Sequence, residues 1–325
     1  MKIVFNTTQP HAPCSMFYID AFKRMKEMSF FDQDFDSYDV ALFMTYDHQL
    51  VEQVKQRYPN LKIGIIDPRS SKVFKSTQHC DFLILDSIEM EDFWRVSRKP
   101  IFRYAEYPDI PYVKKAHEEK NKISIGYHGN QIHLECMAET TSRALTELGK
   151  KYDLELLVMH NGQPPNGKEA WYPENVSVRH VPWSIENYVN ELGNCDIGIV
   201  PNNLVHNDAA KKAAQTNNQF NYSLDDYSLR FKMPSNPGRF IIFGKLGIPV
   251  VADFYPSALQ YLQNGAGFVA HNPGGWYHCL EELITSRDLR QKMGESLQCL
   301  VKDEFDFDSQ NEKLLSFLKS MQAKR

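Results

Sequence analysis

The sequence predicts an α/β protein of two doubly wound domains, and three observations lead to this prediction. Short apolar runs alternate with amphipathic segments of helical length, which is typical of parallel sheets covered by helices. The alternation stops at residues 108–122, where prolines and a run of charges leave no periodicity, and it restarts at residue 123. The length of 325 residues exceeds one ordinary core and suits two domains of about 150 residues each.

In the first half, each expected strand is a short apolar run that ends in polar residues. The strands are residues 2–5, 39–44, 62–66, 81–85 and 100–103, with helices expected at 16–28 and 48–58. Loops at the carboxyl ends of parallel strands form the functional edge of such a sheet. His11, in the loop after the first strand, is therefore either a ligand contact or an incidental loop residue. The other strand-end residues that this rule selects are Tyr46, Asp47, Asp67 and Arg69.

The second half repeats the pattern. Its expected strands are residues 123–127, 154–159, 177–181, 196–200, 248–252 and 267–270. Its expected helices are residues 137–152, 185–192, 257–263, 275–285, 287–301 and 309–319. We therefore predict domains at 1–107 and 123–302, a linker at 108–122 and a tail helix within 303–325. The alternative for 108–122 is an exposed loop within one domain.

Composition narrows the functional classes. The net charge of −4 argues against nucleic-acid binding as the main activity. Six cysteines without a C-x-x-C spacing predict reduced thiols in a cytoplasmic protein, with neither a disulfide framework nor a zinc site. The first expected strand begins at Lys2 and leaves no room for a signal peptide, and no apolar run reaches the length of a membrane span. Peripheral association with a membrane stays open.

Residues 233–253 combine a loop, a helix, a glycine stop and a buried strand. The helix start holds two N-cap candidates, a proline suited to the first helical position and a glycine that bares the backbone: Ser235, Asn236, Pro237 and Gly238. Arg239 follows in the first turn, and Gly247 ends the helix. A helix N-terminus, a glycine and a guanidinium at one point form an anion site that suits phosphate. The alternative is an ordinary helix–strand unit in which Arg239 is a solvated residue.

The same stretch resembles the donor-binding segment of GT-B glycosyltransferases, especially the retaining enzymes classed as family 4. The matching residues are Ser235, Asn236, Arg239, Gly247, Pro249, Val250, Val251 and Ala252. A second segment, residues 182–201, resembles the family through Trp183, Asp196 and Pro201. One position departs from the family. Ile242 stands where members usually carry a glutamate that holds the nucleotide ribose.

The resemblance implies two Rossmann-like domains facing across a cleft, with the C-terminal helix crossing back to the first domain. It implies that a sugar passes from a nucleotide-diphosphate sugar to a glycan or lipid-linked acceptor, as in polysaccharide biosynthesis, with retention of configuration and without a metal ion. The nucleotide-sugar is a substrate, and no cofactor is expected. No Asp-x-Asp metal motif lies at an expected strand end.

The resemblance also suggests site residues. Lys232 and Arg239 would bind the diphosphate, and His11 would contact the acceptor or the donor sugar. The remaining donor contacts would come from a strand-end loop, a segment near the base and the helix start: Gly126, His128, Gly129, Asn130, Pro182, Trp183, Ser235, Asn236 and Gly238. Two alternatives stay open, namely a tight turn with an incidental His128 and a core role for Trp183.

Other functions share parts of this pattern. A nucleotide-sugar epimerase would need carboxylates placed for proton transfer, and none is evident in the sequence. A periplasmic sugar-binding protein would need an export signal. Ile242 keeps one more alternative open, a non-catalytic GT-B-like binding or scaffold protein. The sugar, the base, the acceptor and the oligomeric state are not specified by these patterns.

Overall fold

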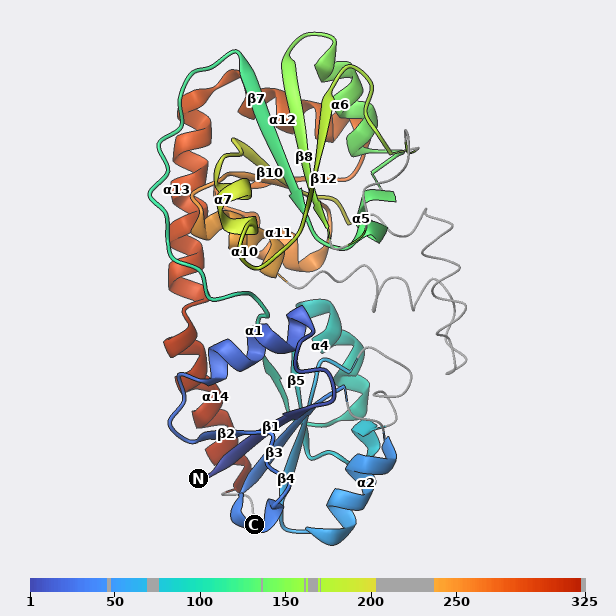
Figure 1. The fold of residues 1–325 in the computed structure, drawn as a ribbon, viewed down its shortest axis with the longest axis vertical. Coiled ribbons are helices and arrows are strands. Elements are labelled where there is room, and N and C mark those ends of the chain that lie inside the picture. The colour runs from blue at the N-terminus through green and yellow to red at the C-terminus, as the bar shows by residue number, and fades with distance from the viewer. Residues whose placement is uncertain are drawn as a thin grey trace. The chain divides into compact units, whose positions relative to one another are not determined.

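The computed structural model describes residues 1–45, 48–68, 76–135, 137–160, 162, 169, 171–202 and 237–322. These residues form two compact units, shown in Figure 1. The first contains residues from 1–109 and 305–322, and the second contains residues from 110–202 and 237–304. Each unit is organised around a six-stranded sheet in which all pairs are parallel. The α/β class and the two doubly wound sheets predicted from the sequence are confirmed.

The sheet of the first unit has the order β2-β1-β3-β4-β5-β6. Its strands are β1 (Ile3–Thr7), β2 (Met28–Phe30), β3 (Val40–Met44), β4 (Lys62–Ile66), β5 (Phe82–Leu85) and β6 (Ile101–Arg103). Its helices are α1 (Pro13–Phe22), α2 (His48–Arg57), α4 (Ile88–Trp94) and α14 (Phe307–Gln322), with short 3-10 turns at Phe35–Ser37, Thr77–His79 and Arg95–Ser97. Every residue of β1 and β3 is buried, as expected for parallel strands with both faces covered.

One prediction for this unit is wrong. The helix expected at residues 16–28 ends at Phe22, and Met28 begins the short edge strand β2. The strand exists because Met28, Ser29 and Phe30 pair in parallel with β1, starting from the register Ile3 to Met28. A three-residue strand of this kind depends on its partner and leaves no periodicity in the sequence.

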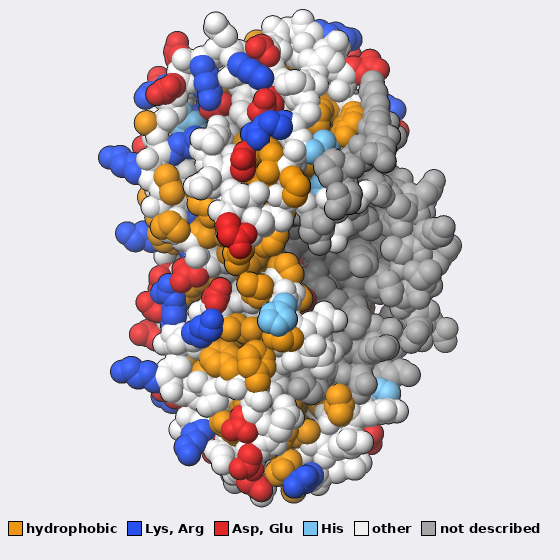
Figure 2. Space-filling view, viewed as in Figure 1, with side chains coloured by type: hydrophobic (Ala, Val, Ile, Leu, Met, Phe, Trp, Pro, Cys, Tyr) orange, Lys and Arg blue, Asp and Glu red, His pale blue; other side chains and the backbone are white. Residues whose placement is uncertain are grey.

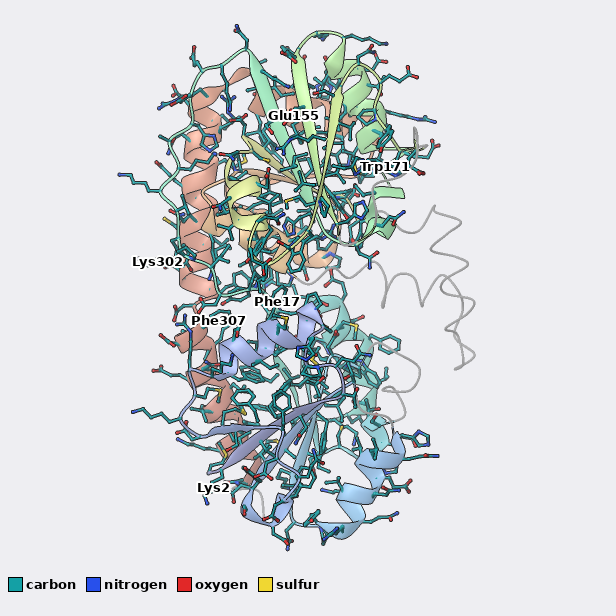
Figure 3. All side chains as sticks on the ribbon, viewed as in Figure 1. Lys2, Phe17, Glu155, Trp171, Lys302 and Phe307 are labelled. Atoms are coloured by element: carbon teal, nitrogen blue, oxygen red, sulfur yellow. The ribbon has the colours of Figure 1, made fainter. Side chains whose placement is uncertain are left out.

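The last helix, α14, packs on the first unit. Asn311 accepts a hydrogen bond from the Tyr104 hydroxyl at 2.8 Å and donates one to the Ala21 carbonyl at 2.9 Å. Phe307, labelled in Figure 3 at the start of α14, stacks on Tyr107 with ring centroids 4.4 Å apart. This is the return of the C-terminal helix that the resemblance implied.

The sheet of the second unit has the order β9-β8-β7-β10-β11-β12. Its strands are β7 (Lys122–His128), β8 (Asp153–His160), β9 (Ser177–Pro182), β10 (Ile197–Val200), β11 (Val250–Asp253) and β12 (Phe268–Ala270). Numbered along the chain, this is the 3-2-1-4-5-6 order of dinucleotide-binding sheets. Its helices are α5 (Gln131–Glu135), α6 (Thr141–Gly149), α7 (Tyr188–Gly193), α10 (Gly238–Lys245), α11 (Pro256–Leu262), α12 (Pro273–Thr285) and α13 (Arg287–Glu304).

The segment at residues 110–121 forms neither helix nor strand, and it is fixed to the second unit by polar contacts. The Val113 amide donates to the Lys245 carbonyl at 2.8 Å, and the Lys115 ammonium donates to the Gly193 carbonyl at 2.6 Å. His117 is buried, with Nε2 lying 3.0 Å from the Gly247 carbonyl oxygen. These contacts tie the segment to the end of α10 and to the last residue of α7.

The described surface mixes charges of both signs. On the face drawn in Figure 2, Lys and Arg side chains are interspersed with Asp and Glu. Among the described residues, no helix combines the length and the apolar character that crossing a membrane requires.

Candidate functional site

The order in which successive strands are added to the second sheet reverses between β7 and β10, and ligands of doubly wound sheets bind at the carboxyl ends of the strands at this point. β7 ends at His128, and β10 ends at Val200 before Pro201 and Asn202. The two strands pair directly, through registers such as Gly198 with Gly126. The topology therefore brings the predicted strand-end loop of β7 beside the end of β10.

Helix α10 begins next to these strand ends. Its first residue is Gly238, and Pro237 precedes it in helical conformation rather than at the first helical position, a small correction to the prediction. Gly247 adopts φ +69° and ends the helix as predicted. The Gly247 amide donates to the Gly244 carbonyl and the Ile248 amide to the Phe243 carbonyl, which is the Schellman pattern. The predicted N-cap residues Ser235 and Asn236 lie outside the described residues.

Arg239 links the first turn of α10 to the end of β10. Its guanidinium donates from Nη1 to the Pro201 carbonyl at 2.9 Å and from Nη2 to the Asn202 side-chain oxygen at 3.0 Å. The side chain is only 8% exposed, so Arg239 is not a solvated surface residue. A guanidinium held in a fixed direction loses less entropy when it binds an oxyanion.

Asn202 is fixed in turn by a buried carboxylate at the end of β11. The Asn202 amide donates to Asp253 Oδ2 at 2.6 Å, and the Trp276 indole on α12 donates to Asp253 Oδ1 at 2.8 Å. Asn202, Asp253 and Trp276 are each at most 3% exposed. Each carboxylate oxygen thus accepts one N–H, and the ends of β10, β11 and α10 form one hydrogen-bonded network. Sequence analysis missed Asn202, Asp253 and Trp276 as parts of this edge.

His128 serves this network from β7. Its Nε2 lies 3.1 Å from the Arg239 carbonyl oxygen, which can only accept, so Nε2 carries the proton. The ring packs edge-on against Phe243 with centroids 5.0 Å apart. Burial lowers the pKa of His128 to about 4, so the ring is neutral at neutral pH. In the described residues, the His128 side chain therefore contacts α10.

Gly129 occupies a position that requires glycine. Its φ is +143°, and an added Cβ would lie 3.2 Å from Arg239 Cδ and 3.1 Å from the Tyr127 hydroxyl oxygen. The Gly129 amide donates to the Met159 carbonyl at 3.1 Å, and the Asn130 carbonyl accepts from the Tyr127 hydroxyl at 2.6 Å. Backbone without a side chain therefore lies directly against the aliphatic part of Arg239.

The other predicted donor contacts differ in where they lie along their strands. Gly126 is inside β7, where an added Cβ would lie 2.8 Å from the Cys195 sulfur, so its absence of a side chain serves packing. Pro182 and Trp183 lie at the end of β9, two strands from β7. Trp183 is half-buried and lies 5.5 Å from the Tyr188 ring. Lys232 lies outside the described residues.

The first unit has a different strand-end edge. Thr45 follows β3 with φ +63°, and its hydroxyl lies 3.0 Å from the Thr7 hydroxyl at the end of β1. The Thr8 hydroxyl lies 2.8 Å from that of Thr45, and the Thr7 hydroxyl lies 3.2 Å from Ser15. His11 is exposed in this loop. The predicted edge residues Tyr46, Asp47 and Arg69 lie outside the described residues.

Three carboxylates also converge in the first unit. Asp67, Asp86 and Glu106 follow β4, β5 and β6, and their oxygens lie within 4.8 Å of one another. Together with burial, the charges of Glu106 and Asp67 raise the pKa of the Cys14 thiol to about 11. Such a trio has the composition of a cation site. The sequence predicted no metal site, because the three acids come from three strands and form no local motif.

No protein-family model and no curated protein matches the sequence. Solved structures do match. The chain is similar to Anabaena Alr3699/HepE in complex with UDP, with a TM-score of 0.62 and 12% identity over 98% of this chain and 100% of that chain.

Two further structures extend this likeness. The trehalose-6-phosphate synthase OtsA matches with a TM-score of 0.61 and 10% identity, over 98% of this chain and 99% of that chain. S. aureus TarM, in complex with Fondaparinux, alpha-GlcNAc-glycerol and UDP, matches with a TM-score of 0.56 and 10% identity. That match covers 86% of this chain and 55% of TarM, so the chain spans about half of TarM. The chain has the GT-B fold of these glycosyltransferases, with two Rossmann-like domains.

Proposed function

We propose that the protein is a glycosyltransferase that binds a nucleoside diphosphate sugar at the carboxyl edge of its second sheet. One observation carries the proposal. At the carboxyl ends of β7 and β10, the neighbouring strands where the strand order reverses, the bare backbone of Gly129 lies against Arg239 in the first turn of α10. A helix N-terminus, an arginine and a glycine at the reversal point of a 3-2-1-4-5-6 sheet together suit a diphosphate.

The reaction needs stabilisation of the charge on the departing diphosphate. The N-terminal end of the α10 dipole and the Arg239 guanidinium supply positive charge at one point, with Lys232 as the second basic candidate. A fixed donor of this kind contributes about 3–4 kcal/mol in the transition state. We therefore propose a transfer that needs no metal ion, and we carry over retention of configuration from the resemblance. Activity that survives EDTA unchanged would support the first of these two points.

The donor and acceptor are assigned by class. The structures of Alr3699/HepE were obtained with UDP and with UDP-glucose, which supports UDP as the first nucleotide to test. At the edge of the first sheet, Thr8 is exposed and Thr45 is partly exposed, and their hydroxyls offer hydrogen bonds suited to sugar hydroxyls. We therefore propose that this unit binds a glycan or lipid-linked acceptor.

A second candidate function is a non-catalytic GT-B protein. Its support is Ile242, which is 5% exposed in α10 at the position of the family's ribose-binding glutamate. An epimerase has less support, because the Asp253 carboxylate accepts N–H bonds with both oxygens and is buried. The Asp253 carboxylate is therefore not placed to transfer a proton to or from a sugar.

A thermal-shift screen with UDP, GDP, ADP and CMP tests the proposal. A nucleotide at a hundred times its dissociation constant stabilises the protein by about 2.7 kcal/mol. We expect one nucleotide to stabilise the wild type, and we expect the response to fall in Arg239→Ala and partly in Arg239→Lys, which keeps the charge without the planar fork. Each variant is compared with its own unliganded melting point, because Arg239 also has a packing role. If no nucleotide stabilises the wild type, the non-catalytic function is the better account.

A further inference from the structure

Phe254 is an exposed aromatic residue between two buried neighbours. It follows β11 directly and is 56% exposed, whereas Asp253 is 3% and Tyr255 is 1% exposed. A single exposed apolar side chain is ordinary on a protein surface. The position of Phe254 on the candidate edge, and the rigidity of its backbone, make this ring different.

The backbone on both sides of the ring is fixed. The Phe254 amide donates to the Ala270 carbonyl at 2.7 Å, which joins it to the end of β12. Asp253, before it, accepts from Asn202 and Trp276. Tyr255, after it, caps α11 and accepts the Leu259 amide at 2.9 Å. A ring presented by rigid backbone costs little entropy when a ligand packs on it.

The candidate site residues follow one another along the edge of the sheet. In the order of the strands, Trp183 follows β9, Gly129 follows β7, Asn202 follows β10 and Phe254 follows β11. Neighbouring strands lie about 4.8 Å apart, so Trp183 and Phe254 are each about two strand spacings from Gly129, on opposite sides. The anion site lies between the two aromatic residues.

A nucleoside diphosphate sugar has the same order of parts: a flat base, a diphosphate in the middle and a sugar ring. Resting on the proposed function, we propose that Phe254 packs against the apolar face of the donor's sugar ring, with the base at the Trp183 end. His271 and Asn272, both exposed, follow β12 beside Phe254 and offer polar groups for the sugar hydroxyls. Phe254 is then a residue that determines specificity for the transferred sugar.

Calorimetric titration with UDP and with UDP-glucose tests this assignment. Covering about 50 Å² of ring surface is worth up to about a tenfold change in affinity. We expect Phe254→Ala to lower the affinity for UDP-glucose by about three- to tenfold and to leave the affinity for UDP unchanged. We expect Phe254→Tyr to keep both affinities. Leu259→Ala is the matched control, because Leu259 is an exposed apolar residue of α11, with an exposed fraction of 48%.

The outcomes separate this inference from the proposed function. The titration uses the nucleotide that stabilises the wild type in the thermal-shift screen and its diphosphoglucose, with UDP and UDP-glucose as the first pair. If the wild type binds no nucleotide of the screen, the donor site itself is overturned, and the assignment of Phe254 falls with it. If the wild type binds both and Phe254→Ala weakens them equally, or weakens neither, the donor site stands and the sugar contact is overturned. An equal loss of UDP-glucose affinity in Leu259→Ala also contradicts a specific role for Phe254.

Discussion

Each sheet has six parallel strands, yet the residues at the carboxyl ends of the strands differ in chemistry between the two sheets. The second sheet presents a glycine at φ +143°, a helix start and a buried arginine at the carboxyl ends of β7 and β10. The first sheet presents clustered hydroxyls and, at the ends of β4, β5 and β6, three carboxylates. One edge therefore suits an anion and the other suits groups that donate hydrogen bonds. The two scaffolds are alike, so the chemical difference between the edges lies in the strand-end residues.

A substitution in the core of α14 should have the largest effect, and it tests whether this helix stabilises the first unit. Leu314 in α14 is fully buried, so Leu314→Asp places an unpaired charge in the core of the first unit. We expect a loss of at least about 4 kcal/mol in the free energy of unfolding. Hydrogen exchange should show lost protection in β1 and β3 while β7 and β10 stay protected. The neighbouring exposed Lys313→Asp is the control. Equal loss of protection in both sheets would contradict the assignment of α14 to the first unit.

The second prediction concerns the network of the second edge. Asp253→Asn keeps one acceptor oxygen and turns an amide NH₂ toward either Asn202 or Trp276, each of which donates an N–H. We expect a loss of about 2–4 kcal/mol, measured by denaturant unfolding. Adding Trp276→Phe removes one of the two donors, so the double variant should lose less than the sum of the single variants. Additive losses would show that the two contacts are not coupled.

The third prediction uses pH. Burial holds the pKa of His128 near 4, below its unfolded value of 6.5, so the unfolded chain binds the proton first. Stability contributed by the neutral ring is full above pH 6.5 and falls as the pH drops toward 4, by about 2 kcal/mol at pH 5. Chemical denaturation at pH 7 and pH 5 should show a smaller difference for His128→Gln than for the wild type. An unchanged difference would refute the assignment.

Two glycine substitutions should have the smallest effects on stability, and they differ in what an added side chain would contact. Gly129→Ala forces a side chain into a left-handed conformation within 3.2 Å of Arg239 Cδ, which should cost about 1–2 kcal/mol and reduce the response to UDP. Gly193→Ala meets nothing within 4 Å and should leave stability and the UDP response unchanged. Thermal melts with and without UDP measure both quantities. A normal UDP response in Gly129→Ala would remove Gly129 from the site.

Local signals were predictable from the sequence, and long-range contacts were not. Gly247 correctly predicted the end of α10, because a glycine with positive φ ends a helix through contacts within a few residues of the chain. The edge strand β2 was missed because its three residues depend on β1, 25 residues earlier in the register Ile3 to Met28. The role of Asp253 was hidden because its partners lie 51 and 23 residues away. The contact of the His128 ring with α10 could not be predicted either, because Arg239 lies 111 residues away in the sequence.

A crystal structure of the protein with UDP is the decisive test of a donor site in the second unit. We expect the diphosphate at the start of α10, beside Gly129 and Arg239, with the base toward Trp183. UDP bound at the edge of the first sheet, or bound away from the start of α10, would contradict it.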